Sequence, residues 1–369
     1  MTRVSSDPED DPRSPVTSTV SDVSSLVAEH LATFVAARRQ SLAGLGPDLV
    51  PFADAAERAV SGGKRLRALF CHAGWMAAGG DAGDRRVAWA AGSLEWLQAS
   101  ALVHDDVMDG SDVRRGNPSA HRAFEQSHRE AGWTSNAEQF GVGGAILLGD
   151  LLLSWSDEMF RSCGLDQDAL ERASAYLDAC KSEVVAGQYL DLVGQARGTN
   201  SVADAMRIVR YKAAKYTVER PLHIGAALAA GAPGLIDALS AFGLPLGEAF
   251  QLRDDVLGVF GDPAVTGKPA GDDLREGKRT VLIARAAERT TPAESALLER
   301  FLGDPTMTPQ TVDSLREILV STGALSQVER DINALENQAE AALATAPVAS
   351  ESARDTLREL AHRSTRRTS

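Results

Sequence analysis

The sequence predicts an all-α fold, a single-domain bundle of about ten or more helices around a central cavity. Apolar residues recur at intervals of three and four along most of the chain, and the alternation typical of strands is nearly absent. Gly, Pro, Asp and Asn separate the periodic segments, as expected at helix ends. Because 44% of the residues are hydrophobic and only 5% aromatic, the core should consist mostly of Ala, Leu and Val.

Length, charge and cysteine content narrow the class of protein. The 369 residues contain no linker rich in Pro, Gly or Ser after the N-terminus, which favours one domain with one continuous core. The net charge of −13 argues against nucleic acid or an anionic membrane as a partner, because both repel a negative surface. No apolar stretch reaches the length of a membrane span. Cys71, Cys163 and Cys180 lack metal-ligand spacing and suit a reducing cytoplasm.

The two ends of the chain differ in composition from its middle. Residues 1–25 are rich in Ser, Thr, Asp and Pro and lack a signal peptide's apolar stretch, so they are interpreted as a disordered leader. Residues 26–350 form the predicted all-α domain. The range 351–369 is interpreted as the end of the last helix followed by a basic tail, frayed over residues 362–369.

Amphipathic helices account for the middle of the chain. The first covers residues 26–40, where Leu26, Leu31 and Phe34 lie on one stripe. The same period then predicts helices over residues 84–106, 141–160, 171–192, 202–229, 234–260 and 278–290.

Two clusters of acids lie within these helices. The first cluster contains Asp105, Asp106 and Asp109, and the second contains Asp254 and Asp255. Asp105 and Asp109 share one helix face because they are four residues apart. The apolar residues 97–103 before them indicate a helix that runs from the core into a polar cavity. Because buried carboxylates need a partner, the clusters predict a bound cation.

The ligand types favour Mg²⁺, which completes its coordination with water and phosphate oxygens. A diphosphate also needs cationic donors. The segment 62–67, GGKRLR, supplies Lys64, Arg65 and Arg67 at the expected start of a helix, where free amides favour an anion. Further cations are Arg114, Arg115, Lys212, Lys215, Lys268 and Lys278. Each alone fits a solvated surface charge, whereas together they indicate one metal-bridged anion site and one held by Lys and Arg.

Six blocks, in this order, resemble the polyprenyl synthetase family, the trans-isoprenyl diphosphate synthases. The blocks are GGKRLR, HDDVMDGSDVRRGNPSAH, GQYLD, YKAAKYT, FQLRDDVLGVFGD and GKPAGDDLREGKRT. The resemblance covers roughly residues 30–345 and implies an isoprenoid synthase fold and a homodimer. It also implies a prenyltransferase that condenses isopentenyl diphosphate head-to-tail with an allylic diphosphate.

The resemblance assigns roles to the charged residues. In this family two acidic helices face each other and bind the allylic diphosphate through Mg²⁺, about three ions per active site. The metal ligands would be Asp105, Asp109 and Asp254, with Asp106 and Asp255 in support. Cations for the leaving diphosphate would be Arg114, Lys212 and Lys268. Isopentenyl diphosphate would contact Lys64, Arg67, Gln98 and Arg115, and Lys278 is a further substrate-binding candidate.

Several uncharged residues and histidines are weaker candidates. Gln251 precedes the second acid cluster by about one helical turn, so it could stabilise the carbocation or orient a metal-bound water, or be a polar residue at the core edge. Supporting candidates around the site are Gln188, Asp191, Tyr216 and Thr217. His104 and His121 match the family motif and are interpreted as hydrogen-bonding support.

Three positions depart from the family's pattern. Gly258 stands where many members have a third Asp in the second cluster, which puts one metal contact in doubt. Asp262, Asp272 and Asp273 lie nearby in the sequence. Ala213 replaces the usual Thr or Ser, and Ala68 replaces a common Pro; activity is expected to survive all three changes.

Product length is expected to depend on the helix before the first acid cluster. In this family the growing chain follows that helix, and an aromatic residue at Ser100 or Ala101 would stop it after about fifteen carbons. Both residues are small, and Leu97 on the same face is the predicted floor, with Ser93 and Leu94 deeper. The prediction is geranylgeranyl diphosphate, with farnesyl and longer diphosphates as alternatives.

Two other functions use related chemistry. A terpene cyclase also ionises an allylic diphosphate with Mg²⁺, but it has no need for the GGKRLR block. A non-catalytic synthase subunit usually lacks the acid clusters, which are both present here.

Overall fold

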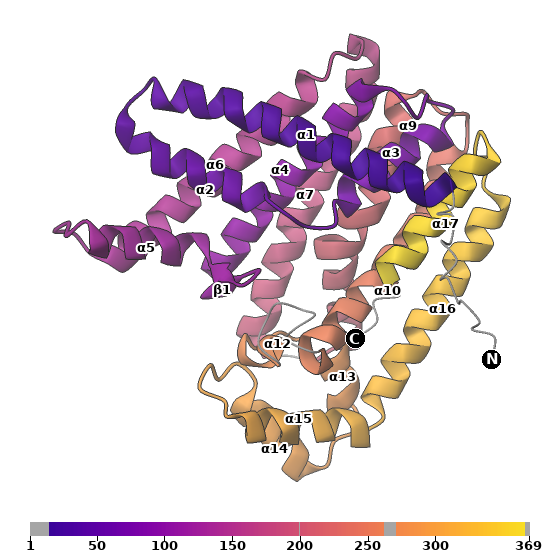
Figure 1. The fold of residues 1–369 in the computed structure, drawn as a ribbon. Coiled ribbons are helices and arrows are strands. Elements are labelled where there is room, and N and C mark those ends of the chain that lie inside the picture. The colour runs from indigo at the N-terminus through magenta and orange to yellow at the C-terminus, as the bar shows by residue number, and fades with distance from the viewer. Residues whose placement is uncertain (1–14, 199, 262–270, 366–369) are drawn as a thin grey trace, which may run out of the picture.

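The computed structural model describes residues 15–198, 200–261 and 271–365, and these residues form a bundle of helices (Figure 1). The predicted all-α class is confirmed. The helices are α1 (Pro15–Ala43), η1 (Pro47–Leu49), α2 (Val50–Val60), α3 (Leu66–Ala77), α4 (Arg85–Met108), α5 (Ala120–Glu130), α6 (Ala137–Arg161), α7 (Gln167–Arg197), α8 (Val202–Ile208), η2 (Val209–Glu219), α9 (Arg220–Leu228), α10 (Leu235–Phe260), α12 (Asp272–Arg275), α13 (Val281–Ala287), α14 (Pro292–Phe301), α15 (Pro309–Ser321), α16 (Ala324–Thr345) and α17 (Glu351–Thr365).

A short antiparallel hairpin follows α4. Its strands are β1 (Val113–Arg114) and β2 (Asn117–Pro118), with Arg114 opposite Asn117. Among the described residues, none of the helices combines the length and the apolar character that crossing a bilayer requires.

The N-terminal helix begins earlier than predicted. The sequence places residues 1–25 in a disordered leader, but α1 begins at Pro15, so that prediction is wrong for residues 15–25. Val20 and Val23 are buried in the core and continue the apolar stripe of Val27 and Leu31 at intervals of three and four. The Ser and Thr residues between them concealed this period, and residues 1–14 lie outside the described residues.

The last helix also departs from the prediction. Helix α17 extends to Thr365, which is buried, so the predicted fraying from residue 362 is wrong up to that point. Leu357 and Leu360 belong to the main apolar cluster, and α17 packs against α1 and α3. Burial of these side chains stabilises the end of the helix.

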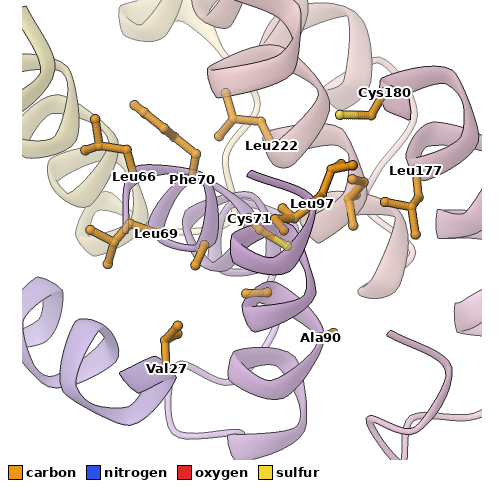
Figure 2. Close-up of a cluster of buried hydrophobic side chains, with 14 of the residues drawn as sticks. Val27, Leu66, Leu69, Phe70, Cys71, Ala90, Leu97, Leu177, Cys180 and Leu222 are labelled. Carbon is orange, nitrogen blue, oxygen red and sulfur yellow. The ribbon is translucent and has the colours of Figure 1, made fainter. Parts of the chain in front are cut away.

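The buried apolar side chains form two clusters instead of the single continuous core that we predicted. The larger includes Phe70, Trp96 and Leu222, and Figure 2 shows part of it. The smaller is built from α12–α16 and the second half of α10, including Leu252 and Ile283. Helix α10 contributes to both clusters, so it joins the two parts of the bundle (Figure 1).

A π-helix, η2, covers the YKAAKYT block. π-helical turns are uncommon and are frequent at functional sites. Two neighbouring helices approach its backbone closely through glycines. A Cβ atom at Gly187 of α7 would lie 2.3 Å from the Lys212 nitrogen, and one at Gly247 of α10 would lie 2.6 Å from the Ala214 Cα. The segment that carries Lys212 is therefore held between α7 and α10.

Candidate active site

A cavity of about 1270 Å³ lies among α3, α4, α6, α7, η2, α10 and the segment 273–280. The predicted site residues that line it are Lys64, Arg67, Gln98, Ala101, Asp105, Arg114, Arg115, Lys212, Gln251, Asp254, Asp255 and Lys278. Asp106 and Asp109 are buried behind this lining, with side chains 4% and 3% exposed. Lys268 lies outside the described residues.

The first acidic wall is formed by α4. Asp105 Oδ1 lies 3.3 Å from the Lys212 Nζ atom, and the same ammonium donates to Asp191 at 2.6 Å. Burial opposes ionisation of Asp105, but the charges of Lys212, Lys278 and Arg114 outweigh it, so its pKa lies below the usual range. The π-helical turn thus brings a cation directly onto the first wall.

Asp109 is the least satisfied carboxylate of the first wall. Both of its oxygens are buried without a hydrogen-bond partner. Burial, and then the charge of Asp105, raise the pKa of Asp109 to about 6. A buried carboxylate in this state fits a divalent cation, because a hard cation prefers oxygen ligands and would remove the repulsion.

The second acidic wall is formed by α10. Asp254 and Asp255 both line the cavity. Gln251 Nε2 donates to Asp255 Oδ1 at 2.8 Å, so this amide orients the carboxylate. Burial, and then the charge of Asp273, raise the pKa of Asp255 to about 7. Like the first wall, the second therefore holds a carboxyl group whose ionised form is destabilised.

Lys278 connects the first wall with the segment that follows α10. Its ammonium lies 3.8 Å from Asp109 Oδ2 and 3.3 Å from Asp273 Oδ1, and it also contacts Glu276. Burial opposes its charge, but Asp273, Glu276 and Asp109 hold the pKa of Lys278 well above its ordinary value. Asp109 at the end of α4 and Asp273 in the segment after α10 thus share one ammonium group. Among the described residues, no three acidic, His or Cys side chains converge closely enough to hold a metal by themselves.

The two predicted arginines after the first cluster have different anchors. Arg114 Nε donates to Asp106 Oδ1 at 2.9 Å, and a second guanidinium nitrogen also contacts that oxygen. Asp106 thus orients a cation toward the cavity from behind the wall. Arg115 donates to the Ser61 carbonyl at 2.6 Å and has a positive φ of 52°, which is uncommon outside glycine. Burial, and then repulsion by Arg65, lower its pKa.

Arg67 of the GGKRLR block and Gln98 of α4 are positioned by the π-helix. The Arg67 guanidinium lies 4.2 Å from the centre of the Tyr216 ring and donates to Thr217 Oγ1 at 2.8 Å. The Tyr216 hydroxyl donates to Gln98 Oε1 at 2.7 Å. Tyr216 and Thr217 therefore hold two predicted substrate-binding residues in place.

Sequence reasoning missed the pairing of Arg65 with Glu95. Arg65 Nη1 lies 3.3 Å from Glu95 Oε2, both side chains are nearly buried, and both residues line the cavity. Arg65 also has a positive φ, 55°. The spacing of Glu95 and Gln98, three residues apart on one helix, was the available signal for a second polar residue on that face.

Only one of the three residues that were predicted to control chain length lines the described cavity. Ala101 lines the cavity, but Leu97 and Ser100 are buried in packing and are absent from its lining. Figure 2 shows Leu97 within the apolar core. The apolar residues of the described cavity lining include, besides Ala101, side chains of α4, α6 and α7, namely Leu102, Ile146, Val184 and Val185.

Of the remaining polar candidates, some line the described cavity and one does not. Gln188 lines the cavity, and its Nε2 is buried without a hydrogen-bond partner. His104 lines it as well, with Nε2 3.2 Å from the Ile146 carbonyl oxygen. His121 is not part of the described lining; its ring lies 3.2 Å from Ser119 Oγ, and burial lowers its pKa. His121 therefore contacts the N-cap residue of its own helix, α5.

With this geometry in place, comparison with known proteins identifies the class. The polyprenyl synthetase family model matches residues 51–319, and the chain belongs to this family. It is an all-α prenyltransferase.

Individual relatives are similar over most of their length. Geranylgeranyl diphosphate synthase of Mycobacterium tuberculosis is 32% identical over 295 residues, 80% of this chain and 78% of the relative. Geranylfarnesyl diphosphate synthase of Aeropyrum pernix is 32% identical over 272 residues, 73% of this chain and 79% of the relative. A crystal structure of geranylgeranyl pyrophosphate synthase from Corynebacterium glutamicum, complexed with isoprenyl diphosphate and magnesium, superimposes with a TM-score of 0.90. Its sequence is 41% identical, and the match covers 95% of this chain and 99% of that chain.

Proposed function

We propose that this protein condenses isopentenyl diphosphate head-to-tail with an allylic diphosphate, after Mg²⁺-dependent ionisation of the allylic substrate. The observation that carries the proposal is that acids of both walls, Asp105 of α4 and Asp254 and Asp255 of α10, line one cavity together with the arginines of the GGKRLR block. One cavity thus offers two kinds of anion site.

Asp105, Asp109 and Asp254 would hold the magnesium ions, of which we propose about three per site. The buried, unbonded oxygens of Asp109 support this assignment. When bound, Mg²⁺ supplies Lewis acidity that stabilises the charge on the leaving diphosphate. Asp106 and Asp255 support the walls, the former through Arg114 and the latter through its hydrogen bond with Gln251.

Cations of the chain assist departure of the diphosphate. Lys212 lies on the first wall, fixed by Asp105 and Asp191, and Arg114 is fixed by Asp106. Both are therefore preorganised for the charge that develops as the carbon–oxygen bond breaks. Lys268 is proposed for the same role on its sequence position alone.

Isopentenyl diphosphate would bind the metal-free group of Lys64, Arg67, Gln98 and Arg115, and we propose Arg65, which lines the same cavity, as a further member. Its double bond then attacks the allylic carbocation. A proton is lost, with the released diphosphate as the proposed acceptor.

We propose geranylgeranyl diphosphate as the product, with farnesyl or longer diphosphates as alternatives. The small side chain of Ala101 supports elongation beyond farnesyl length, and the relatives named above make C20 and C25 products. We also propose a cytoplasmic location, supported by three free buried cysteines, and a homodimer. An apolar face on α6 and α7, with Leu147, Val185 and Tyr189 at least 64% exposed, supports the dimer.

The decisive experiment supplies the purified chain with Mg²⁺, labelled isopentenyl diphosphate and each allylic starter in turn, followed by chain-length analysis. We expect a C20 prenyl diphosphate. Asp105→Ala or Asp254→Ala should lower turnover at least about 1000-fold with unchanged helical circular dichroism, because charge stabilisation is lost. Asp178→Ala, at a side chain 73% exposed, is the control.

The other outcomes point elsewhere. Cyclic hydrocarbon formed from an allylic diphosphate alone would identify a terpene cyclase. An inactive purified chain that becomes active only with a second subunit would identify a non-catalytic partner.

A further inference from the structure

Gly258 of α10 has a specific neighbour. It lies four residues after Asp254, on the same helix face, where the sequence lacks a third acid. A Cβ atom at this position would lie 1.9 Å from Asp273 Oδ2 and 2.5 Å from the carboxylate carbon. The carboxylate of Asp273 therefore occupies the space that a side chain at position 258 would need.

Asp273 is held in this place by its own segment. It lies in the first turn of α12, where the next residue, Leu274, is 1% exposed and belongs to the smaller apolar cluster. The Lys278 N–H donates to the Asp273 carbonyl at 3.1 Å. Asp273 itself lines the cavity with its side chain 13% exposed. Its backbone is thus fixed while its carboxylate faces the second wall.

Asp273 lies among several other acids in the described part of the cavity. Lys278 contacts Asp109, Asp273 and Glu276 with one ammonium. Asp254 and Asp255 add further acids to the same part of the cavity lining. Asp273 therefore shares the Lys278 ammonium with Asp109 and Glu276 while its carboxylate lines the cavity.

We propose that Asp273 supplies the third carboxylate of the second wall, from α12 in place of α10, and that it takes part in binding the divalent cations. Gly258 is required because any side chain there would displace the Asp273 carboxylate. This inference rests on the proposed function, since it assigns one more residue to the same metal site. It also explains how the wall can be complete although the second cluster ends in glycine.

The test measures metal binding directly. Mn²⁺ is titrated into the full chain with inorganic diphosphate present, and bound Mn²⁺ is followed by electron paramagnetic resonance. Asp273→Asn, which keeps the shape and removes the charge, should lower Mn²⁺ affinity about 10- to 100-fold. Asp272→Asn, at the neighbouring residue outside the cavity lining, is the matched control and should bind Mn²⁺ as the wild type does.

Two further variants test whether the Asp273 carboxylate needs the space beside Gly258. Gly258→Ala changes no charge but should weaken Mn²⁺ binding, because its methyl group forces the Asp273 side chain aside. The double variant Gly258→Asp with Asp273→Gly moves the carboxylate to α10 and should recover most of the affinity that Asp273→Asn loses. Thermal unfolding of each variant checks that it remains folded.

The outcomes separate this inference from the proposed function. Failure of the wild type to bind Mn²⁺ with diphosphate would remove both. Wild-type binding together with unchanged affinity in Asp273→Asn and Gly258→Ala would overturn the role of Asp273 alone, leaving it a structural partner of Lys278.

Discussion

Burial makes the charged form of several ionisable side chains in this protein unfavourable. Asp109 and Asp255 are buried acids whose pKa values are raised to about 6 and about 7, and both belong to the acidic walls. His223, which does not line the described cavity, is affected by burial in the same way, but its pKa is lowered because the charged form of histidine is the protonated one. It is 1% exposed, and burial lowers its pKa to about 4.

The surroundings of His223 keep it neutral. Its ring nitrogens lie 3.2 Å from Arg220 Nη1 and 3.0 Å from Ser240 Oγ, and the Tyr176 ring packs against it. Glu219 raises its pKa, whereas Arg220 and Lys215 lower it. Arg220 is itself paired with Glu183.

Stability should therefore depend on pH through His223. An unfolded histidine titrates near 6.5, so below that pH the unfolded chain takes up a proton that the folded protein resists, and stability falls. Between pH 7 and pH 5 the loss in unfolding free energy should be about 2 kcal/mol. Urea unfolding of His223→Gln should show a correspondingly flatter pH dependence, and His362→Gln, at an exposed position, should not. Equal slopes in the wild type and His223→Gln would contradict this reading.

Among the elements, the π-helix η2 has the most consequences for function. It carries Lys212 to Asp105, stacks Tyr216 on Arg67, and bonds Thr217 to the same guanidinium. One irregular helix thus contributes to both proposed anion sites. Its place depends on close backbone contact with α7 at Gly187.

Gly187→Ala should impair the allylic half of the reaction. The added methyl group meets the Lys212 backbone, which must shift, so the ammonium leaves its position between Asp105 and Asp191. We expect kcat to fall about 100-fold with little change in KM for isopentenyl diphosphate, because a preorganised charge is lost. Gly194→Ala on the same helix is the matched control, since its Cβ atom would meet only the Ile208 side chain at 3.5 Å. Similar losses in both variants would indicate a general packing defect.

At the scale of the whole molecule, the exposed apolar side chains of α6 and α7 are relevant both to the proposed dimer and to the shape of the cavity. Val185 and Tyr189 are 68% and 66% exposed, yet both also line the cavity. A second copy on this face would therefore also cover one side of the site. This arrangement would make assembly and cavity shape interdependent.

Sedimentation velocity can test the dimer. The wild type should sediment as a dimer, whereas Leu147→Arg should sediment as a monomer, because a charge replaces an exposed apolar side chain at the proposed interface. Val320→Arg on α15, where the side chain is 54% exposed, is the control and should remain dimeric. A monomeric wild type at micromolar concentration would refute the proposed interface.

The sequence predicted the helical class, the two acid clusters and most cations that line the cavity. These features could be predicted because the helical period and the spacing of charges depend only on residues that are close together in the sequence. It was wrong about the start of α1, where Ser and Thr hide the stripe of Val20 and Val23, and about the end of α17. Leu97 was predicted to face the cavity, but it packs in the apolar core. The helical period shows which residues share one side of a helix, but not which part of the protein lies opposite that side.

The amino-acid order alone thus determined which chemistry is present: carboxylates, ammonium groups and guanidinium groups on amphipathic helices. Only the tertiary structure decided which of them meet, as in Lys278 on Asp109, Arg65 on Glu95, and Asp273 against Gly258. The physical reason is that these contacts join segments far apart in the chain. Their distances follow from how closely helix backbones approach, which no local pattern encodes.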